Sequence, residues 1–150
     1  MIAIDQGVSR YFKSHNGPRL RAALGMATCL GTGAVWVPLY ALFLVISRGQ
    51  TFRLVSILVL AEVTGLFFII ILRYRTKRER PAKSVKVFSL TPWNRYSFPS
   101  HHALRASILT VVIGTGFPRL LTFLLPVAAV VDFSRIYLSK HYLSDVVVGC

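Results

Sequence analysis

Two uninterrupted apolar runs constrain the fold of this chain more than any other feature of its sequence. The first covers residues 24–46 and the second covers residues 52–71. A helix rises about 1.5 Å per residue, so the first run would reach about 35 Å, enough to cross a hydrocarbon core of about 30 Å with some tilt. Both runs therefore predict membrane-spanning helices.

Shorter apolar segments follow in the C-terminal half, at residues 100–116, 120–137 and 141–150. The first two predict further helices of the same bundle. The last would extend only about 15 Å, roughly half of a bilayer, and so predicts a truncated span.

The N-terminal residues predict a different kind of helix. Apolar side chains recur there at helical spacing while polar side chains take the other faces: Ile4, Val8, Tyr11 and Phe12. This pattern is typical of an amphipathic helix that lies on a membrane surface. We therefore expect an all-α fold, in which residues 1–150 form a single membrane-embedded helical bundle. It would have about five spans, the last one truncated, and an interfacial helix within residues 1–20.

The composition indicates the chemical nature of the partners. Hydrophobic residues make up 54% of the chain, yet Lys and Arg number 18 against 5 Asp and Glu, for a net charge of +13. An apolar and strongly basic chain predicts a multi-pass membrane protein that faces anionic lipids, in a bacterial inner membrane or a eukaryotic endomembrane. Nucleic acid is not expected as a partner, because the basic residues flank apolar spans instead of covering a soluble domain.

A basic segment, residues 73–99, separates the second apolar segment from the third and shows no helical pattern. It contains three prolines and many cations, including Lys83 and Lys86. Connections of this length are usually functional, and the aromatic side chains of Trp93 and Tyr96 suit a membrane interface. We expect a basic loop that forms part of a functional site.

Helix counting places polar residues from distant segments on one side of the membrane. The third apolar segment starts on the side of the basic loop, the fourth returns to that side, and the fifth starts there. The residues expected to meet are Arg73, Arg80, Ser100, His101, His102, Arg135, His141 and Asp145.

These residue types suit phosphate chemistry. His141 and Asp145 stand four apart, so the carboxylate would accept from Nδ1–H and leave Nε2 as a base or nucleophile. His102 lies in the first turn of another helix, where unpaired N–H groups attract anions, and Ser100 suits the N-cap. Arginines beside such a helix start are a common means of binding phosphate.

Each of these residues also has a simpler interpretation. An arginine at a helix end commonly anchors the helix at the interface, and Ser100 would serve as a cap alone. Three histidines and one aspartate would also suit a zinc ion. The surrounding arginines would repel a dication, so we expect no metal and no cofactor.

Three ordered motifs in the cluster resemble the type 2 phosphatidic acid phosphatase family, integral membrane phosphatases related to vanadium haloperoxidases. That family has Lys, six residues, Arg-Pro; then Pro-Ser-Gly-His; then Ser-Arg, five residues, His, three residues, Asp. The chain matches with Arg73 and Arg80-Pro81, with Pro99-Ser100-His101-His102, and with Ser134-Arg135, His141 and Asp145. Arg73 replaces a lysine, His101 replaces a glycine, and the family commonly has six spans.

The resemblance implies an in-line attack of His141 on phosphorus, a phosphohistidine intermediate and no metal. Asp145 would hold His141, and His102 would protonate the leaving oxygen and then activate water. The implied substrate is a lipid phosphate or diphosphate, such as phosphatidic acid, phosphatidylglycerophosphate or a polyisoprenyl diphosphate. Its equatorial oxygens would be bound by Arg73, Arg80, Ser100, the N–H of His101, and Arg135.

Two other functions fit the same sequence. A phosphotransferase would pass the phosphoryl group to a lipid or sugar hydroxyl, and a non-catalytic scaffold would bind anionic headgroups through its basic residues alone. Two carboxylates in apolar segments, Glu62 and Asp132, are expected to be structural. Glu62 would be protonated and bonded to a neighbouring helix, and Asp132 would pair with an arginine of the cluster.

Overall fold

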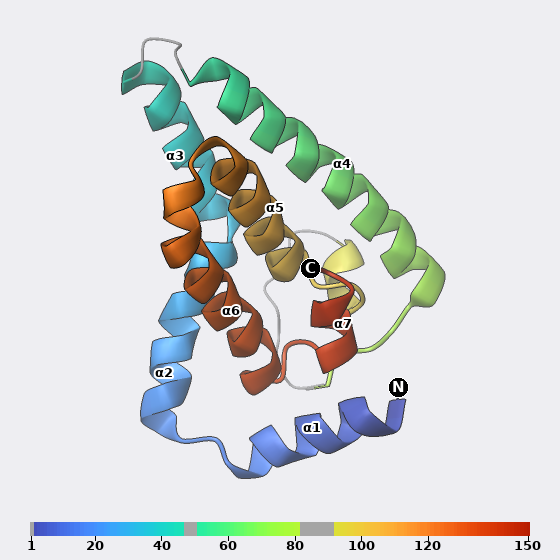
Figure 1. Ribbon diagram of the computed structural model, residues 1–150. Helices are drawn as coiled ribbons and strands as arrows, with labels where there is room; N and C mark the ends of the chain where they lie inside the picture. The colour runs from blue at the N-terminus through green and yellow to red at the C-terminus, as the bar shows by residue number, and fades with distance from the viewer. Residues whose placement is uncertain (1, 47–50, 82–91) are drawn as a thin grey trace.

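The computed structural model describes residues 2–46, 51–81 and 92–150, and every regular element within these ranges is helical (Figure 1). The predicted all-α fold is therefore confirmed. Lys83 and Lys86 of the basic segment lie outside the described residues. The elements are α1 (Ile2–Ser14), α2 (Pro18–Ala27), η1 (Thr28–Gly31), α3 (Gly33–Ile46), α4 (Phe52–Thr76), η2 (Pro92–Arg95), α5 (His101–Gly116), η3 (Pro118–Leu120), α6 (Leu121–Tyr137) and α7 (Leu143–Val147).

The first apolar run is a broken helix and not the single straight helix that its length predicts. The unit of α2 and η1 is bent by 46° against α3, because Thr32 adopts an extended conformation between two glycines. The glycines also permit close packing. A Cβ on Gly31 would lie 2.7 Å from Cδ2 of His102 and 3.1 Å from Cγ1 of Val131. The break therefore lies against α5 and α6.

α4 is longer than predicted and includes the first arginine of the expected basic loop. The helix continues to Thr76 and ends where Lys77 adopts a left-handed conformation with φ 47°. Arg73 is buried near the end of α4 and donates to Oδ1 of Asn94 at 2.9 Å and to the carbonyl of Pro99 at 3.1 Å. The loop boundary predicted at residue 73 is therefore wrong, because these contacts hold the end of α4 as a helix against η2.

α5 lies between α4 and α6 and contacts both (Figure 1). It begins directly after Ser100, whose side chain accepts from the N–H of Ala103 at 3.4 Å and so acts as the predicted N-cap. α6 returns antiparallel to α5 after the turn at η3. The polar ends of both helices are thereby brought to the end of the bundle that carries α7.

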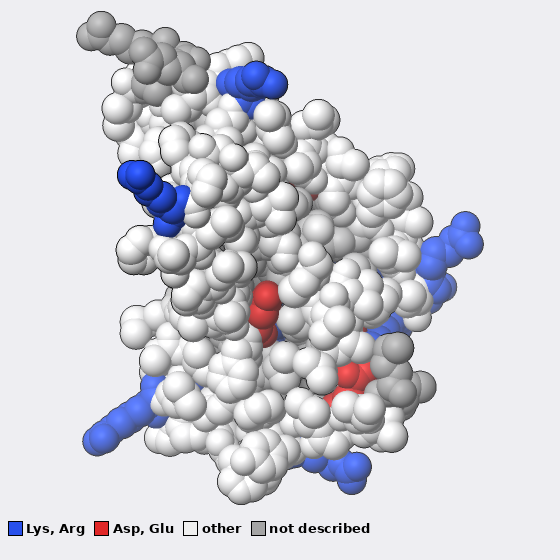
Figure 2. Space-filling model, in the orientation of Figure 1, with Lys and Arg blue, Asp and Glu red and all other residues white. Residues whose placement is uncertain are grey.

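Two helices in the described part of the chain are long and apolar enough to cross a membrane: α4 and the continuous helix Pro118–Tyr137. The bent pair of α2–η1 and α3 would make a third span. Large apolar side chains point outward, and Leu60 and Phe123 are 68% and 71% exposed. On the face that Figure 2 shows, Lys and Arg lie toward the ends and edges, and the broad middle region is mostly uncharged apart from a small central patch of acidic atoms. This distribution suits a belt of side chains in lipid.

α1 lies across one end of the bundle, close to the ends of α6 and α7 (Figure 1). Phe12 packs on Tyr137 with ring centroids 5.5 Å apart. Ile4 is exposed, whereas Asp5 and Ser9 are buried against the protein. Part of the polar face of this amphipathic helix therefore faces the bundle and not water.

Candidate active site

His141 lies in the turn between α6 and α7, at the centre of the polar cluster, and is buried. Its Nδ1 lies 2.7 Å from the carbonyl oxygen of Ser97, and its Nε2 lies 3.3 Å from Nη1 of Arg80. A carbonyl only accepts and a guanidinium only donates, so Nδ1 carries the proton and Nε2 presents a lone pair. This is the tautomer that a nucleophilic imidazole requires.

The surroundings of His141 oppose its protonation. Burial lowers the pKa of His141 well below its usual range, and the charges of Arg135, Arg80 and Arg73 lower it further, together with His102. The imidazole is therefore neutral near pH 7. These four side chains come from α4, the segment that follows it, α5 and α6, so four parts of the chain meet at the imidazole of His141.

The link between α6 and α7 turns tightly through a left-handed residue. Ser139 has φ 52°, which reverses the chain just after α6 ends. The carbonyl of Arg135 then accepts from the N–H groups of both Lys140 and His141, at 3.0 and 3.1 Å. The five-residue spacing within the third motif thus brings Arg135 and His141 together.

Asn94 in η2 holds both arginines of the first motif. Its side-chain oxygen accepts from Arg73 at 2.9 Å, and its main-chain carbonyl accepts from Arg80 at 2.9 and 3.2 Å. Arg80 also donates to the carbonyl of Lys140 at 2.9 Å, next to His141. Sequence reasoning missed Asn94, because no spacing rule distinguishes it from other polar residues of the basic segment.

Arg135 comes from the last turn of α6 and is buried. Its Nη1 donates to Oγ1 of Thr28 at 2.7 Å, so the broken first span contributes to the site. The Nε groups of Arg73 and Arg135 are buried and have no hydrogen-bond partner among the described residues. Buried unpaired N–H groups cost free energy, and an anion bound between the arginines would satisfy them.

The second motif meets the third at the start of α5. Ser100 is fully buried, and its N–H donates to the carbonyl of Asp145 at 2.9 Å. His101 and His102 form the first turn of α5 and are partly buried. The structure therefore brings together all the residues that helix counting groups on one side: Arg73, Arg80, Ser100, His101, His102, Arg135, His141 and Asp145.

Asp145 lies close to His141, but two other groups use its oxygens at shorter distances. Oδ2 is 3.6 Å from Nδ1 of His141, and the same oxygen accepts from the N–H of Tyr142 at 2.9 Å. Oδ1 accepts from Arg78 at 2.8 Å. Neither the carbonyl of Ser97 nor the guanidinium of Arg78 was identified from the sequence. A main-chain contact leaves no pattern in the sequence, and the motif does not specify the six residues between Arg73 and Arg80, which include Arg78.

Glu62 is part of a largely buried ion pair. Its two oxygens accept from Nε and Nη2 of Arg105, each at 2.9 Å, and Oε1 also accepts from Tyr40 at 2.9 Å. The expected bonding to neighbouring helices is confirmed, and Arg105 places a positive charge directly beside Glu62. The expected arginine partner of Asp132 is wrong within the described residues, where Asp132 accepts from Sγ of Cys150 at 3.3 Å.

A family model described as the PAP2 superfamily matches residues 50–150. The chain belongs to the PAP2 superfamily. A curated relative of this PAP2 chain is an undecaprenyl-diphosphatase of Sulfolobus acidocaldarius, 32% identical over 122 residues, which cover 79% of this chain. The matched part spans 58% of the length of that relative.

Two solved structures share the fold of this PAP2 chain. The transmembrane PAP2-type phosphatidylglycerolphosphate phosphatase of Bacillus subtilis superposes with a TM-score of 0.78 at 23% identity, covering 98% of this chain and 77% of that one. LpxE of Aquifex aeolicus superposes with a TM-score of 0.76 at 27% identity, covering 95% and 86%. Because nearly the whole chain is covered, the shared fold includes helices that precede the family match.

Proposed function

We propose that this PAP2 protein is a membrane enzyme that hydrolyses a lipid phosphate or diphosphate through a phosphohistidine at His141. One observation carries the proposal: a buried neutral imidazole presents its Nε2 lone pair beside Arg80, with Arg73 and Arg135 acting on the same ring. A phosphoryl group is negatively charged, so cations have to compensate its charge. A neutral imidazole can attack it without charge repulsion, and the three arginines supply the compensating charge.

In the proposed first step, Nε2 of His141 attacks phosphorus in line. The N–P bond forms as the bond from phosphorus to the leaving oxygen breaks. His102, whose protonated form the negative charge of the bound phosphate would favour, donates a proton to that oxygen. The carbonyl of Ser97 and the carboxylate of Asp145 would stabilise the positive charge that develops on the imidazole. The equatorial oxygens would be bound by Arg73, Arg80, Ser100, the N–H of His101, and Arg135.

In the proposed second step, water attacks the phosphohistidine. His102 accepts the proton of the water, the N–P bond breaks, and inorganic phosphate leaves with His141 restored. The unpaired Nε groups of Arg73 and Arg135 support the binding of the equatorial oxygens, because negative charge is spread over these oxygens during both steps.

A polyisoprenyl diphosphate is the first substrate to test, since the curated relative is an undecaprenyl-diphosphatase. Phosphatidic acid, phosphatidylglycerophosphate and lipid A phosphates complete the panel. We also propose that the chain is a multi-pass membrane protein of about five spans. The fourth and fifth spans would be α5 and the truncated segment that contains α7, in addition to the three described above. The site would lie at one membrane surface, with the lipid tail of the substrate in the bilayer.

The test is phosphate release from this lipid panel by the purified protein in lipid vesicles, with EDTA present and with His141→Ala as the blank. We expect release that survives EDTA and is absent from His141→Ala, together with acid-labile protein labelling from a radiolabelled substrate. Activity that EDTA abolishes, or that His141→Ala retains, would contradict the proposal. Phosphorylated alcohol in place of free phosphate would indicate a phosphotransferase, and lipid binding without turnover would indicate a scaffold.

A further inference from the structure

Asp5 is a buried carboxylate on the helix that the sequence places at the membrane surface. It is 3% exposed. Oδ1 accepts from the N–H of Ser144 at 3.0 Å, and Oδ2 accepts from the hydroxyl of the same serine at 2.6 Å. Ser144 lies in the first turn of α7, where N–H groups have no partner within the helix. Asp5 therefore caps α7 from a different part of the chain.

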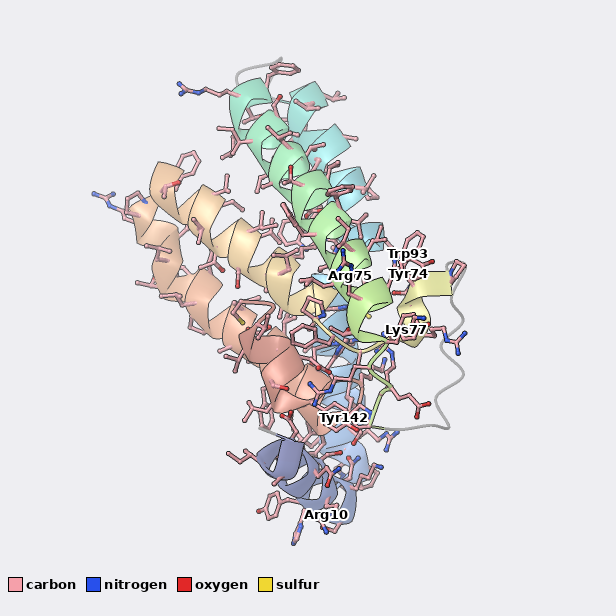
Figure 3. The ribbon with its side chains drawn as sticks, turned by 90° about the vertical axis from the view of Figure 1, so that its right-hand side faces the viewer. Arg10, Tyr74, Arg75, Lys77, Trp93 and Tyr142 are labelled. Carbon is pink, nitrogen blue, oxygen red and sulfur yellow. The ribbon has the colours of Figure 1, made fainter. Side chains whose placement is uncertain are left out.

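Arg78 joins Asp5 to Asp145. Nη2 donates to Oδ2 of Asp5 at 2.7 Å, while Nη1 donates to Oδ1 of Asp145 at 2.8 Å and to Oγ of Ser144 at 2.7 Å. Its Cζ lies 4.3 Å from the centroid of the Tyr142 ring, and Figure 3 shows Tyr142 between the end of α4 and α1. One guanidinium thus links α1, the first motif and α7.

The charge of Asp5 is retained although the group is buried. Burial raises the pKa of Asp5, but hydrogen bonds from Ser144 and Arg78 outweigh it, and the pKa is lowered. An ionised carboxylate that is buried and fully hydrogen-bonded has one favourable orientation. The network therefore fixes α1 relative to the first turn of α7.

We propose that Asp5 and Arg78 are positioning residues, which clamp α1 onto α7 and thereby hold Asp145 and His141 in place for phosphoryl transfer. The proposal rests on the function proposed above. Oδ2 of Asp145 is 3.6 Å from Nδ1 of His141, so Arg78 and Asp145 alone separate Asp5 from the nucleophile. A misplacement of about 1 Å can reduce a rate by roughly 100-fold, so the clamp affects turnover without touching substrate.

Asp5→Asn is the first test, because it keeps the size and one acceptor for the Ser144 N–H but removes the charge that pairs with Arg78. We expect kcat to fall about 10-fold while KM changes less than about two-fold, since Asp5 makes no contact with substrate. The matched control is Gln6→Ala at the neighbouring exposed position of α1, which should keep the wild-type kcat and KM.

Arg78 variants can be tested through the kcat–pH profile, which would not change if Arg78 had a purely structural role. Asp145 faces Arg78, Asp5 and His141, and it interacts with the charges of Arg73 and Arg80. Burial raises the pKa of Asp145, whereas the N–H of Tyr142 and the charge of Arg78 lower it. Arg78→Met removes that charge, so the acidic limb of the kcat–pH profile should move to higher pH. Arg78→Lys should restore the limb but not the full kcat, because one ammonium lacks the geometry of the guanidinium fork.

Wild-type kcat in both Asp5→Asn and Arg78→Met, or an acidic limb that stays fixed in Arg78→Met, would overturn the clamp. A wild-type protein that releases no phosphate from any lipid would instead overturn the proposed function. Amide hydrogen exchange at Ser144 separates these failures. Faster exchange in Asp5→Ala, which removes both acceptors of Ser144, than in Gln6→Ala supports the clamp without reference to turnover, and equal exchange overturns it.

Discussion

The carbonyl oxygen of Ser97 lies 2.7 Å from Nδ1 of His141, closer than Oδ2 of Asp145 at 3.6 Å. The main chain therefore fixes the tautomer of this imidazole, and the carboxylate adds negative charge beside it. A carbonyl of the main chain stays in place when side chains are substituted. The imidazole should consequently keep part of its orientation in any variant of Asp145.

Asp145→Asn should reduce kcat for phosphate release by about 10- to 100-fold. Where a carboxylate alone sets the tautomer of a catalytic histidine, the same substitution costs about 10,000-fold. Here the Ser97 carbonyl still accepts from Nδ1–H, so only the electrostatic support of the carboxylate is lost. The measurement is kcat against the His141→Ala blank, with thermal unfolding to verify folding. A loss near 10,000-fold in a folded variant would assign the tautomer to Asp145.

The neutral state of His141 should make the stability of the protein depend on pH. The unfolded chain binds a proton at this residue near pH 6.5, whereas burial and the arginines lower the pKa in the folded protein. The stability from this residue is thus complete above about pH 6.5 and is lost as the pH falls below that value. From pH 7 to pH 5, the wild-type protein should lose more stability than His141→Gln, by up to about 2 kcal/mol, the limit that the unfolded pKa sets. Unfolding in detergent at the two pH values measures the difference, and equal losses would contradict it.

The meeting of the three motifs could be predicted because the number of membrane crossings decides which side each helix end occupies. Arg135 and His141 illustrate this, since each lies where an apolar segment ends or begins, and the structure joins them through one turn. The N-cap role of Ser100 could also be predicted, because it depends only on local sequence.

Other parts of the site depend on tertiary packing and leave no pattern in the sequence. A straight and a broken helix contain apolar runs of the same length, so the break at Thr32 was not predicted. Asp5 has the spacing of a solvated residue, and only the packing of α1 on the bundle reveals that it is buried. The contacts of Asn94 depend on the conformation of η2, which periodicity does not encode.

The pair of Glu62 and Arg105 should show strong coupling in stability. Their side chains are only 12% and 9% exposed, so either charge is poorly compensated when its partner is removed. Such a loss typically costs about 3–5 kcal/mol, and we expect this range for Glu62→Gln and for Arg105→Met. The double variant leaves no unpaired charge and should lose much less than the sum. A double-mutant cycle by thermal unfolding tests this, and additive losses would argue against a compensated pair.

Gly31→Ala should impair turnover through His102. The added Cβ would lie 2.7 Å from Cδ2 and 3.1 Å from Cβ of His102, and 3.1 Å from Cγ1 of Val131. Because a close contact involves the base of the histidine side chain and not its flexible end, the ring has to move. We expect kcat to fall about 10- to 100-fold with a smaller change in KM, since the proposed proton donor is displaced while the arginines proposed to bind phosphate are not. Gly25→Ala is the matched control, because a Cβ there meets nothing within 4 Å and alanine favours the helix. Wild-type kcat in Gly31→Ala would mean that the broken first span does not fix the position of His102.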